Sequence, residues 1–266
     1  MTASALWRPC RHPSPLPTCS GTTRCRRPAG RSSPPALPGG RRAPWRGEIV
    51  HQLIEQGAEV AFLDLDAGDS SPGDARFIRC DVRDIAALQG VVQQVAEELG
   101  TIDILVNNAA RDDRIRFDEV DVARWDEQID VNVRHHFFAT QAVAPFMRRA
   151  GGGSIITMGS ISAHIDLRDL AGYVTAKAGI EGLTRTLARE LGRDRIRVNC
   201  VIPGWIMTER QLRDWVTPEA EGLIEASQAL PEKLVPADVA RLVLWLAAED
   251  SRLCTGQRWI VDGGWM

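Results

Sequence analysis

From residue 47 to the C-terminus, short apolar runs alternate with longer segments of helical periodicity. The runs predict strands at 59–64, 77–80, 104–106, 154–158, 197–201 and 258–261. The longer segments predict helices at 48–56, 85–99, 122–149, 171–191 and 237–247. Strands separated by helices of about ten residues or more are typical of crossover connections within a parallel sheet. We therefore predict an α/β domain over 47–266, with a doubly wound, Rossmann-like parallel sheet covered by helices on both faces.

Residues 1–46 differ sharply from the rest of the chain. They contain nine arginines and nine of the 15 prolines, but no Asp or Glu. Proline removes a backbone donor and interrupts helices and central strands, so we predict that this leader is disordered or poorly packed. The first strand of the sheet is therefore in doubt.

Composition excludes several classes of function. With 266 residues, a net charge of −3 and no apolar run long enough to cross a bilayer, the chain is expected to bind neither nucleic acid nor membranes. Its six cysteines show no C-x-x-C pair, which argues against a disulfide framework or a zinc site and favours the cytoplasm. His135 and His136 are adjacent and are expected to point to different sides of a helix, so we predict no metal site.

In a doubly wound sheet, ligands bind at the carboxyl ends of the strands. Asp64 closes its predicted strand, where a carboxylate can hold the adenosine ribose hydroxyls of NAD and repel the extra phosphate of NADP. The alternative is a solvated carboxylate without a ligand. Asp81 and Val82 follow the next strand, and Asn108 follows the third.

The most specific pattern is formed by Ser160, Tyr173 and Lys177. Tyr173 is the only tyrosine and Lys177 is one of two lysines, and they stand four residues apart on one face of a predicted helix. An ammonium there can lower the pKa of the phenol and make it a usable base. Ser160 follows the predicted 154–158 strand and can reach the same crevice. The alternative is a buried tyrosine with a chance lysine neighbour.

With these residues in place, the sequence from Gly47 onward resembles the short-chain dehydrogenase/reductase family. The matching motifs are Asn-Asn-Ala-Ala at 107–110, Asn132, Gly159-Ser160, Tyr173-x-x-x-Lys177, Pro-Gly-Trp-Ile-Met-Thr at 203–208 and Asp-Gly-Gly at 262–264. The resemblance implies that Tyr173 transfers the proton, Ser160 orients the reacting oxygen, Lys177 also binds the nicotinamide ribose, and Asn132 holds a relay water.

The same resemblance implies a site for NAD. Four residues would line its adenosine half, namely Asp64, Asp81, Val82 and Asn108. Ile206 and Thr208 would hold its carboxamide and pyrophosphate. Relatives in this family also suggest a homotetramer or a homodimer.

Within the family the chain is most similar to bacterial aldose 1-dehydrogenases, through motifs such as Arg-Asp-Asp-Arg at 111–114. This implies oxidation of the C1 hydroxyl of an aldose, for example D-xylose or L-arabinose, to the lactone. The expected sugar contacts are Asp112, Asp113, Ser162, His164 and Trp205, beneath a lid at 207–230. The alternatives are another alcohol or ketone as substrate, such as a polyol or a 3-oxoacyl thioester, and a non-catalytic relic of the fold.

The relic remains an alternative because one family motif is missing. Family members begin with a strand and a T-G-x-x-x-G-x-G turn, whose glycines let the backbone approach the pyrophosphate. The family's usual spacing places Gly40 at the first glycine, but Pro44 and Arg46 at the other two. We therefore hypothesise that a frameshift or a gene-boundary error has replaced this segment, and we expect weak dinucleotide binding if the protein is made as written.

Overall fold

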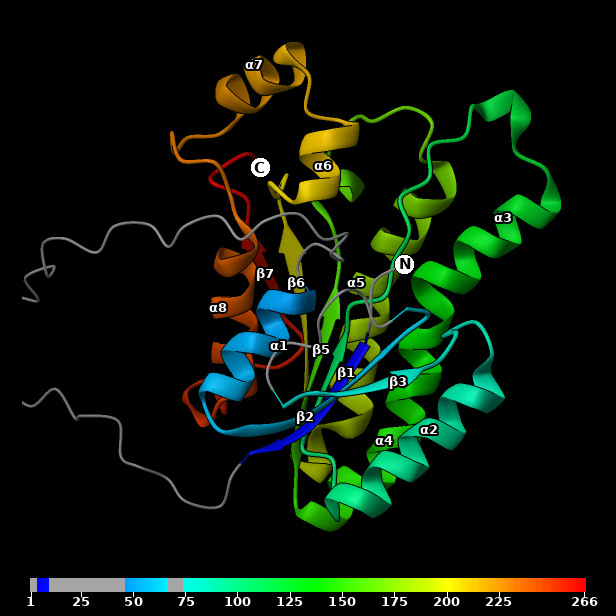
Figure 1. Ribbon diagram of the computed structural model, residues 1–266, viewed down its shortest axis with the longest axis vertical. Coiled ribbons are helices and arrows are strands. Elements are labelled where there is room, and N and C mark those ends of the chain that lie inside the picture. Colours follow the sequence, from blue (N-terminus) through cyan, green and yellow to red (C-terminus); the bar gives the residue numbers. More distant parts are fainter. Residues whose placement is uncertain (1–3, 10–45, 67–73) are drawn as a thin grey trace, which may run out of the picture.

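The computed structural model describes residues 4–9, 46–66 and 74–266. Most of the 1–46 leader therefore lies outside the described residues. The described elements form a seven-stranded sheet with helices on both faces (Figure 1). The strands are β1 (Ser4–Pro9), β2 (Ala58–Asp64), β3 (Arg76–Arg79), β4 (Ile104–Asn107), β5 (Gly153–Met158), β6 (Ile196–Pro203) and β7 (Arg258–Val261). The helices are α1 (Arg46–Glu55), α2 (Ile85–Leu99), α3 (Val122–Ile129), α4 (His135–Ala150), α5 (Ala171–Leu191), α6 (Glu209–Asp214), α7 (Pro218–Ser227) and α8 (Pro236–Ala247).

The strand order is β3-β2-β1-β4-β5-β6-β7, and every pairing except those of β1 is parallel. The chain crosses over through helices from β4 to β5, from β5 to β6 and from β6 to β7, as the alternating sequence pattern predicts. This confirms the doubly wound α/β fold. The carboxyl ends of β2, β4, β5 and β6 consequently meet at one edge of the sheet.

Strand β1 departs from the prediction in two ways. No strand is predicted within 1–46, yet Ser4–Pro9 lies between β2 and β4 at the centre of the sheet. It also runs antiparallel to both neighbours, with Ser4 opposite Leu63 and Pro9 opposite Ala58. The chain therefore leaves β1 at the amino edge of β2, opposite the edge at which Asp64 lies.

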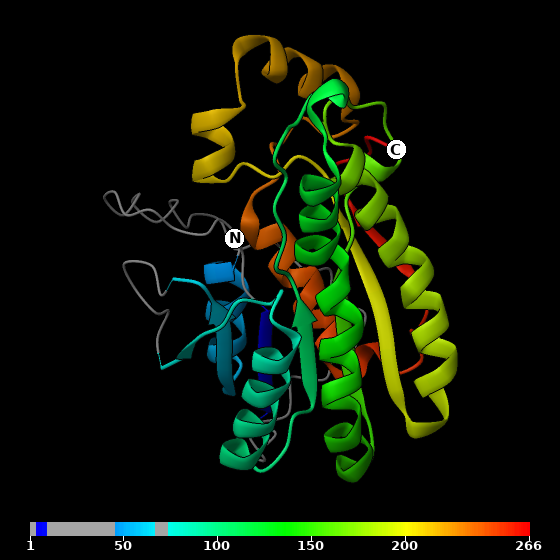
Figure 2. The same cartoon turned by 90° about the vertical axis from the view of Figure 1, so that its right-hand side faces the viewer.

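Two apolar layers hold the helices on the sheet. On one face, Leu53 of α1 and Val243 of α8 pack in the same cluster as Phe62 of β2. On the other, Leu88 of α2 and Val143 of α4 belong to a cluster with strand residues such as Leu105 and with residues of α5. Figure 2 shows α2, α4 and α5 side by side in front of the sheet. Fully buried side chains of this kind contribute roughly 1.5–3 kcal/mol each.

The long helix predicted at 122–149 is interrupted. A π-helical turn, Asp130–Arg134, separates α3 from α4, and Asn132 lies within it. Such wide turns carry an extra residue and occur often at functional sites. Helix α2 matches its predicted bounds because its ends carry clear signals: Asp84 accepts a hydrogen bond from the Ala87 amide, and Gly100 ends the helix with a φ of 77°.

Candidate active site

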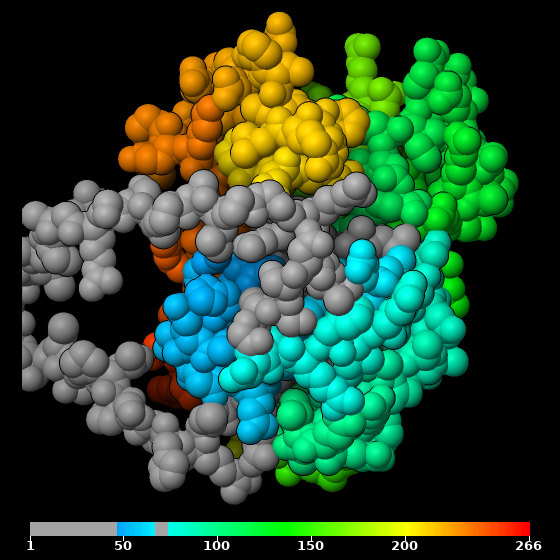
Figure 3. Space-filling model, viewed as in Figure 1, coloured from blue at the N-terminus to red at the C-terminus, as the bar shows by residue number. Residues whose placement is uncertain are grey.

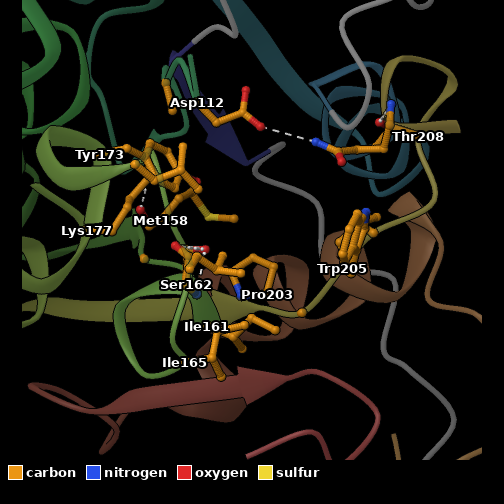
Figure 4. A pocket seen from close by; sticks show the side chains of 18 of the residues that line it. Asp112, Met158, Ile161, Ser162, Ile165, Tyr173, Lys177, Pro203, Trp205 and Thr208 are labelled. Carbon is orange, nitrogen blue, oxygen red and sulfur yellow. Dashed lines mark hydrogen bonds between the residues drawn. The ribbon is translucent and has the colours of Figure 1, made fainter. Parts of the chain in front are cut away.

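A cavity of about 160 Å³ opens at the carboxyl ends of β4, β5 and β6, below α6 and α7 (Figure 4). The segments that follow these strands supply its polar wall, and α5 supplies Tyr173 and Lys177. Its lining residues include Asn108, Asp112, Arg114, Ser160, Ser162, Tyr173, Lys177, Trp205, Ile206, Thr208, Arg210, Gln211 and Trp265. Most of the residues predicted for catalysis and substrate binding therefore face a common space.

Ser160, Tyr173 and Lys177 are held by separate local interactions. Ser160 follows β5 and begins a short 3₁₀ turn, where its hydroxyl accepts hydrogen bonds from the Ser162 amide at 3.2 Å and the Ser162 hydroxyl at 2.8 Å. Lys177 is buried, and its ammonium donates to the Met158 carbonyl at 2.7 Å. Tyr173 is one helical turn before Lys177 on α5 and is half-buried.

Burial and nearby charged and polar groups shift the pKa of Tyr173. Burial raises the pKa of Tyr173 above its usual range, and the Asp112 carboxylate raises it further, while the Ser160 hydroxyl and Arg210 lower it. The Lys177 ammonium lies 5.6 Å from the centre of the phenol ring. Burial also lowers the pKa of Lys177 to about 8. The lowering of the phenol pKa by Lys177 stays a prediction.

The loop after β4 and helix α6 form the opposite wall of the cavity, where they contact each other. Arg210 Nη1 lies 2.6 Å from Asp112 Oδ1, and Gln211 Nε2 donates to Asp112 Oδ2 at 3.2 Å. In the same region the Arg114 guanidinium lies over the Trp215 ring, 4.3 Å from its centre. Carboxylate, amide and hydroxyl groups thus face Tyr173 across the cavity, which suits a ligand with several hydroxyl groups.

Asn132 binds the backbone at the start of the same loop. Its carboxamide oxygen accepts from the Arg111 amide at 2.8 Å, and its nitrogen donates to the Arg111 and Gln128 carbonyls at 3.0 and 2.9 Å. The side chain is fully buried and its bonds all go to the backbone. The structure therefore shows Asn132 fixing the start of the loop that carries Asp112.

The residues predicted for the adenosine half lie along the same sheet edge, outside the cavity except for Asn108. Asp64 is buried at the end of β2, and its carboxylate accepts from the Leu65 amide at 2.7 Å. Asp81 forms an ion pair with Arg83 at 2.6 Å, and hydrogen bonding to Arg83 lowers the pKa of its carboxyl. Val82 and Asn108 are buried.

Thr208 and Ile206, predicted to hold the other half of the cofactor, follow β6 and are buried. The Thr208 hydroxyl accepts from the Gln211 amide at 3.1 Å and so caps the N-terminus of α6. Beside them, Trp205 packs near Trp265, with ring centres 6.4 Å apart. The two segments that meet here, 203–208 and 262–265, are those that carry family motifs.

Two expected sugar contacts lie outside the cavity. His164 Nε2 is 2.6 Å from Glu181 Oε1, and Glu181 also pairs with Arg258 at 3.1 Å, so the imidazole faces α5 and β7. Asp113 forms an ion pair with Arg111. His164 is thus paired with a residue of α5 and Asp113 with a residue of its own loop, and neither lines the cavity; their role as sugar contacts stays a prediction.

The prediction for the adjacent histidines also needs correction. His135 and His136 are both fully buried and their ring centres are 4.4 Å apart, so the rings lie together instead of pointing to different sides. Helix α4 packs against α2, α5, β4 and β5, and a helix enclosed on several sides can bury two successive residues. Over the described ranges, no cluster of three or more His, Cys, Asp or Glu residues could hold a metal ion.

Arg210 and Gln211 are not among the predicted site residues, because the prediction for 207–230 is a lid with no assigned helix. It contains two helices instead, α6 and α7. A signal for α6 was present: Thr208 followed three residues later by Gln211 has the spacing of a capping box. Pro218 after Thr217 similarly indicates the start of α7.

Known proteins are similar to this chain in sequence and in fold. A family model described as enoyl-(acyl carrier protein) reductase matches residues 47–266. The D-xylose 1-dehydrogenase of Caulobacter vibrioides is 51% identical over 222 residues, which cover 80% of this chain and 88% of the relative. The chain belongs to the short-chain dehydrogenase/reductase family.

A second relative, from Rhizobium meliloti and named a probable galactose dehydrogenase, is 43% identical over 226 residues, or 81% of this chain and 88% of the relative. The crystal structure of a 7α-hydroxysteroid dehydrogenase with NADH superimposes with a TM-score of 0.78 at 31% identity, covering 84% of this chain and 90% of that one. The protein is thus an oxidoreductase of a family that uses NAD(P) on small molecules. None of the described helices has the length and apolar character of a membrane span.

Proposed function

We propose that this protein is an NAD-dependent aldose 1-dehydrogenase, which oxidises the C1 hydroxyl of a pentose such as D-xylose or L-arabinose to the lactone. One observation carries the proposal: Ser160, Tyr173 and Lys177 face a small cavity whose other wall presents Asp112 and Gln211. A polyhydroxylated ring needs several convergent polar groups in a confined space, and this cavity provides them. The similarity to two sugar dehydrogenases supports the same substrate class.

The described residues fit NAD at both of its nucleoside ends. The buried Asp64 carboxylate at the end of β2 suits two ribose hydroxyls and disfavours the additional phosphate of NADP. At the other end, one of the three donors of the Lys177 ammonium binds the Met158 carbonyl, so two remain for a nicotinamide ribose. Ile206 and Thr208 would hold the carboxamide side.

The pyrophosphate has no equivalent cradle among the described residues. Strand β1 ends at the amino edge of the sheet, opposite the edge at which Asp64 lies. The sequence of 1–46 also contains no Gly-x-x-x-Gly-x-Gly pattern. We therefore expect this chain to bind NAD through its two ends, with a weak contribution from the middle.

The chemistry divides among few groups. When bound, NAD would supply the hydride acceptor. Tyr173 accepts the proton of the C1 hydroxyl as the C1 hydride departs, which converts the C–O bond of the sugar into the lactone carbonyl. Ser160 donates a hydrogen bond to that oxygen, and Lys177 orients the ribose. Asn132 holds the loop that carries Asp112, and its predicted relay water stays a prediction.

Ser162 and Trp205 complete the proposed sugar site. Ser162 is buried beside Ser160, and the indole nitrogen of Trp205 has no hydrogen-bond partner in the described part of the chain. A buried donor without a partner is costly, and a sugar hydroxyl would satisfy it. The ring faces that surround the cavity also suit the apolar face of a pyranose.

The test is the appearance of NADH absorbance with D-xylose, L-arabinose, D-galactose, D-glucose and L-fucose, beside a polyol and a 3-oxoacyl thioester reaction. Tyr173→Phe is the matched control, because it removes only the hydroxyl. We expect the wild type to oxidise a pentose and the Tyr173→Phe variant to have lost this activity. Activity on the polyol or the thioester alone would reject the aldose assignment, and activity that survives Tyr173→Phe would reject the mechanism.

A further inference from the structure

An ion pair at the cavity links the active site to the helix that covers it. Asp112 belongs to the loop after β4 and Arg210 belongs to α6, and both line the cavity together with Tyr173. The side chains of Asp112 and Arg210 are 26% and 35% exposed, so solvent screens their charges only in part. In Figure 3 the yellow surface of α6 forms part of the top of the molecule, close to the green segments that follow β4.

These two charges act on the phenol in opposite directions. The Asp112 carboxylate raises the pKa of Tyr173, and the Arg210 guanidinium lowers it. Two other cations line the cavity, but Arg114 is stacked on Trp215 and the Lys177 ammonium is bound to the Met158 carbonyl. Among the described residues, Arg210 is the cation that contacts the Asp112 carboxylate directly, while Lys177 interacts with Asp112 without such a contact.

We propose that Asp112 and Arg210 are positioning residues whose ion pair sets how readily Tyr173 gives up its proton, so that the phenol works as a base only while α6 holds Arg210 against Asp112. This inference rests on the proposed function, since it assigns Tyr173 the role of base. A carboxylate next to a developing phenolate opposes it, and a guanidinium bound to that carboxylate cancels most of the opposition. Movement of α6 away from the loop would leave Asp112 uncompensated and would switch the base off.

The geometry also explains why the pair belongs to α6. Thr208 caps this helix, and Gln211 one turn later makes a second contact with Asp112. Asp112 therefore receives two bonds from one short helix, on the side of the cavity that faces Tyr173. In Figure 4 a dashed line marks the hydrogen bond that Asp112 accepts, in the upper part of the view.

The chain offers a direct test because Tyr173 is its only tyrosine. The ultraviolet absorbance of phenolate, followed just after a rapid jump to alkaline pH and before unfolding, reports on this residue alone. Asp112→Asn should form phenolate at lower pH than the wild type, by about half a unit or more, and Arg210→Gln should form it at higher pH. The double variant should fall close to the wild type, because both charges are then absent.

Asp113→Asn is the matched control. Asp113 is the next residue in the same loop, but it pairs with Arg111 and does not line the cavity. Circular dichroism at the same delay shows which samples are folded, and either single variant that stays folded decides the question. Identical titrations for that variant, Asp113→Asn and the wild type would overturn the inference.

The experiment needs neither NAD nor sugar, so it separates this inference from the proposed function. An active sugar dehydrogenase with unchanged tyrosine titrations would reject the ion-pair inference alone. Shifted titrations in a protein that oxidises no aldose would uphold the electrostatic coupling and reject the substrate assignment. In an active enzyme, the acid limb of kcat/KM should move in the same direction as the titration of each variant.

Discussion

The ammonium of Lys177 lies 5.6 Å from the centre of the Tyr173 ring and donates its short hydrogen bond to the carbonyl of Met158. The two residues are neighbours on α5, yet the lysine is directed past the phenol toward the end of β5. Before cofactor binds, Lys177 is therefore a buried cation held by one carbonyl, and its burial lowers its pKa to about 8. The role of Lys177 toward Tyr173 would begin only when a ribose occupies its remaining donors.

The lowered pKa of Lys177 predicts a specific dependence of stability on pH. The folded protein binds this proton less tightly than the unfolded chain, whose lysine has a pKa of 10.5. The contribution of Lys177 to the free energy of unfolding should therefore rise with pH between about 8 and 10.5, by at most about 1.4 kcal/mol per pH unit, while the raised pKa of Cys80 acts in the opposite direction above about pH 9. Urea unfolding of the wild type and of Lys177→Met across this range measures it, because the variant lacks the titration. A stability difference between the two that stays constant with pH would contradict the prediction.

A close helix contact next to Tyr173 predicts opposite effects for two glycines of α5. A Cβ on Gly172 would come within 2.1 Å of Gln128 Oε1 and 2.9 Å of Gln128 Cβ on α3, so Gly172→Ala should destabilise the protein by about 1–3 kcal/mol. Gly179 lies on the same helix with nothing within 4 Å of that position. Gly179→Ala should stabilise by about 0.5–1 kcal/mol, because alanine has less backbone freedom to lose. Thermal unfolding of both variants measures this, and equal effects would show that the α3–α5 contact is not tight.

Most of the fold could be predicted from the sequence, because the patterns that indicate its strands and helices lie within short stretches of the chain. Apolar runs and helical periodicity located all the strands after residue 47, and α5 and β7 have their predicted bounds. Tyr173 and Lys177 could be paired from their spacing alone, since a helix places residues four apart on one face. Ser160 could be predicted to lie near them, because it follows a strand and the carboxyl ends of parallel strands meet at one edge of the sheet.

Some contacts of the site join residues that are distant in the sequence. Asn132, in the π-helical turn between α3 and α4, bonds to Arg111, 21 residues away, and no periodicity reports such a bond. His164 likewise pairs with Glu181 on α5, whereas Asp113 pairs with Arg111 in its own loop. Strand β1 lies between β2 and β4 and pairs with both, although its own sequence shows little strand preference.

The buried histidines predict a loss of stability in acid. Burial, reinforced by the Lys177 charge, lowers the pKa of His135 to about 3, and burial together with His135 lowers that of His136 well below 6.5. Below pH 6.5 the histidines of the unfolded chain bind protons, whereas the buried histidines of the folded protein do not. Their contribution to the free energy of unfolding should therefore be fully present above pH 6.5 and should decrease as the pH falls toward 3. Each histidine contributes a slope of up to about 1.4 kcal/mol per pH unit.

Chemical unfolding between neutral and acidic pH measures this effect in the wild type and in His136→Gln. The variant should lose less stability between the two pH values, although its stability at neutral pH will be lower or similar. His51→Gln serves as the control, since the His51 side chain is 54% exposed and stands on the surface of α1. If the two variants and the wild type lost stability in parallel, the buried pair could not be the cause of acid sensitivity.

The direction of β1 leads to a prediction about cofactor affinity. A family-type strand in the place of β1 would run parallel to β2 and β4 and would deliver its glycine-rich turn at the edge where Asp64 lies, but Ser4–Pro9 runs the other way. Replacing residues 1–46 with a family strand and a T-G-x-x-x-G-x-G turn should place backbone amides at the pyrophosphate and tighten NAD binding by about tenfold or more, roughly 1.4 kcal/mol. Calorimetric titration of both proteins with NAD measures this. The same replacement with the three glycines changed to alanine should lose the gain, because a Cβ blocks close approach of the backbone. If the unaltered chain bound NAD as tightly as the rebuilt one, its own leader would have to supply the phosphate contacts, and the hypothesis of a displaced reading frame would be wrong.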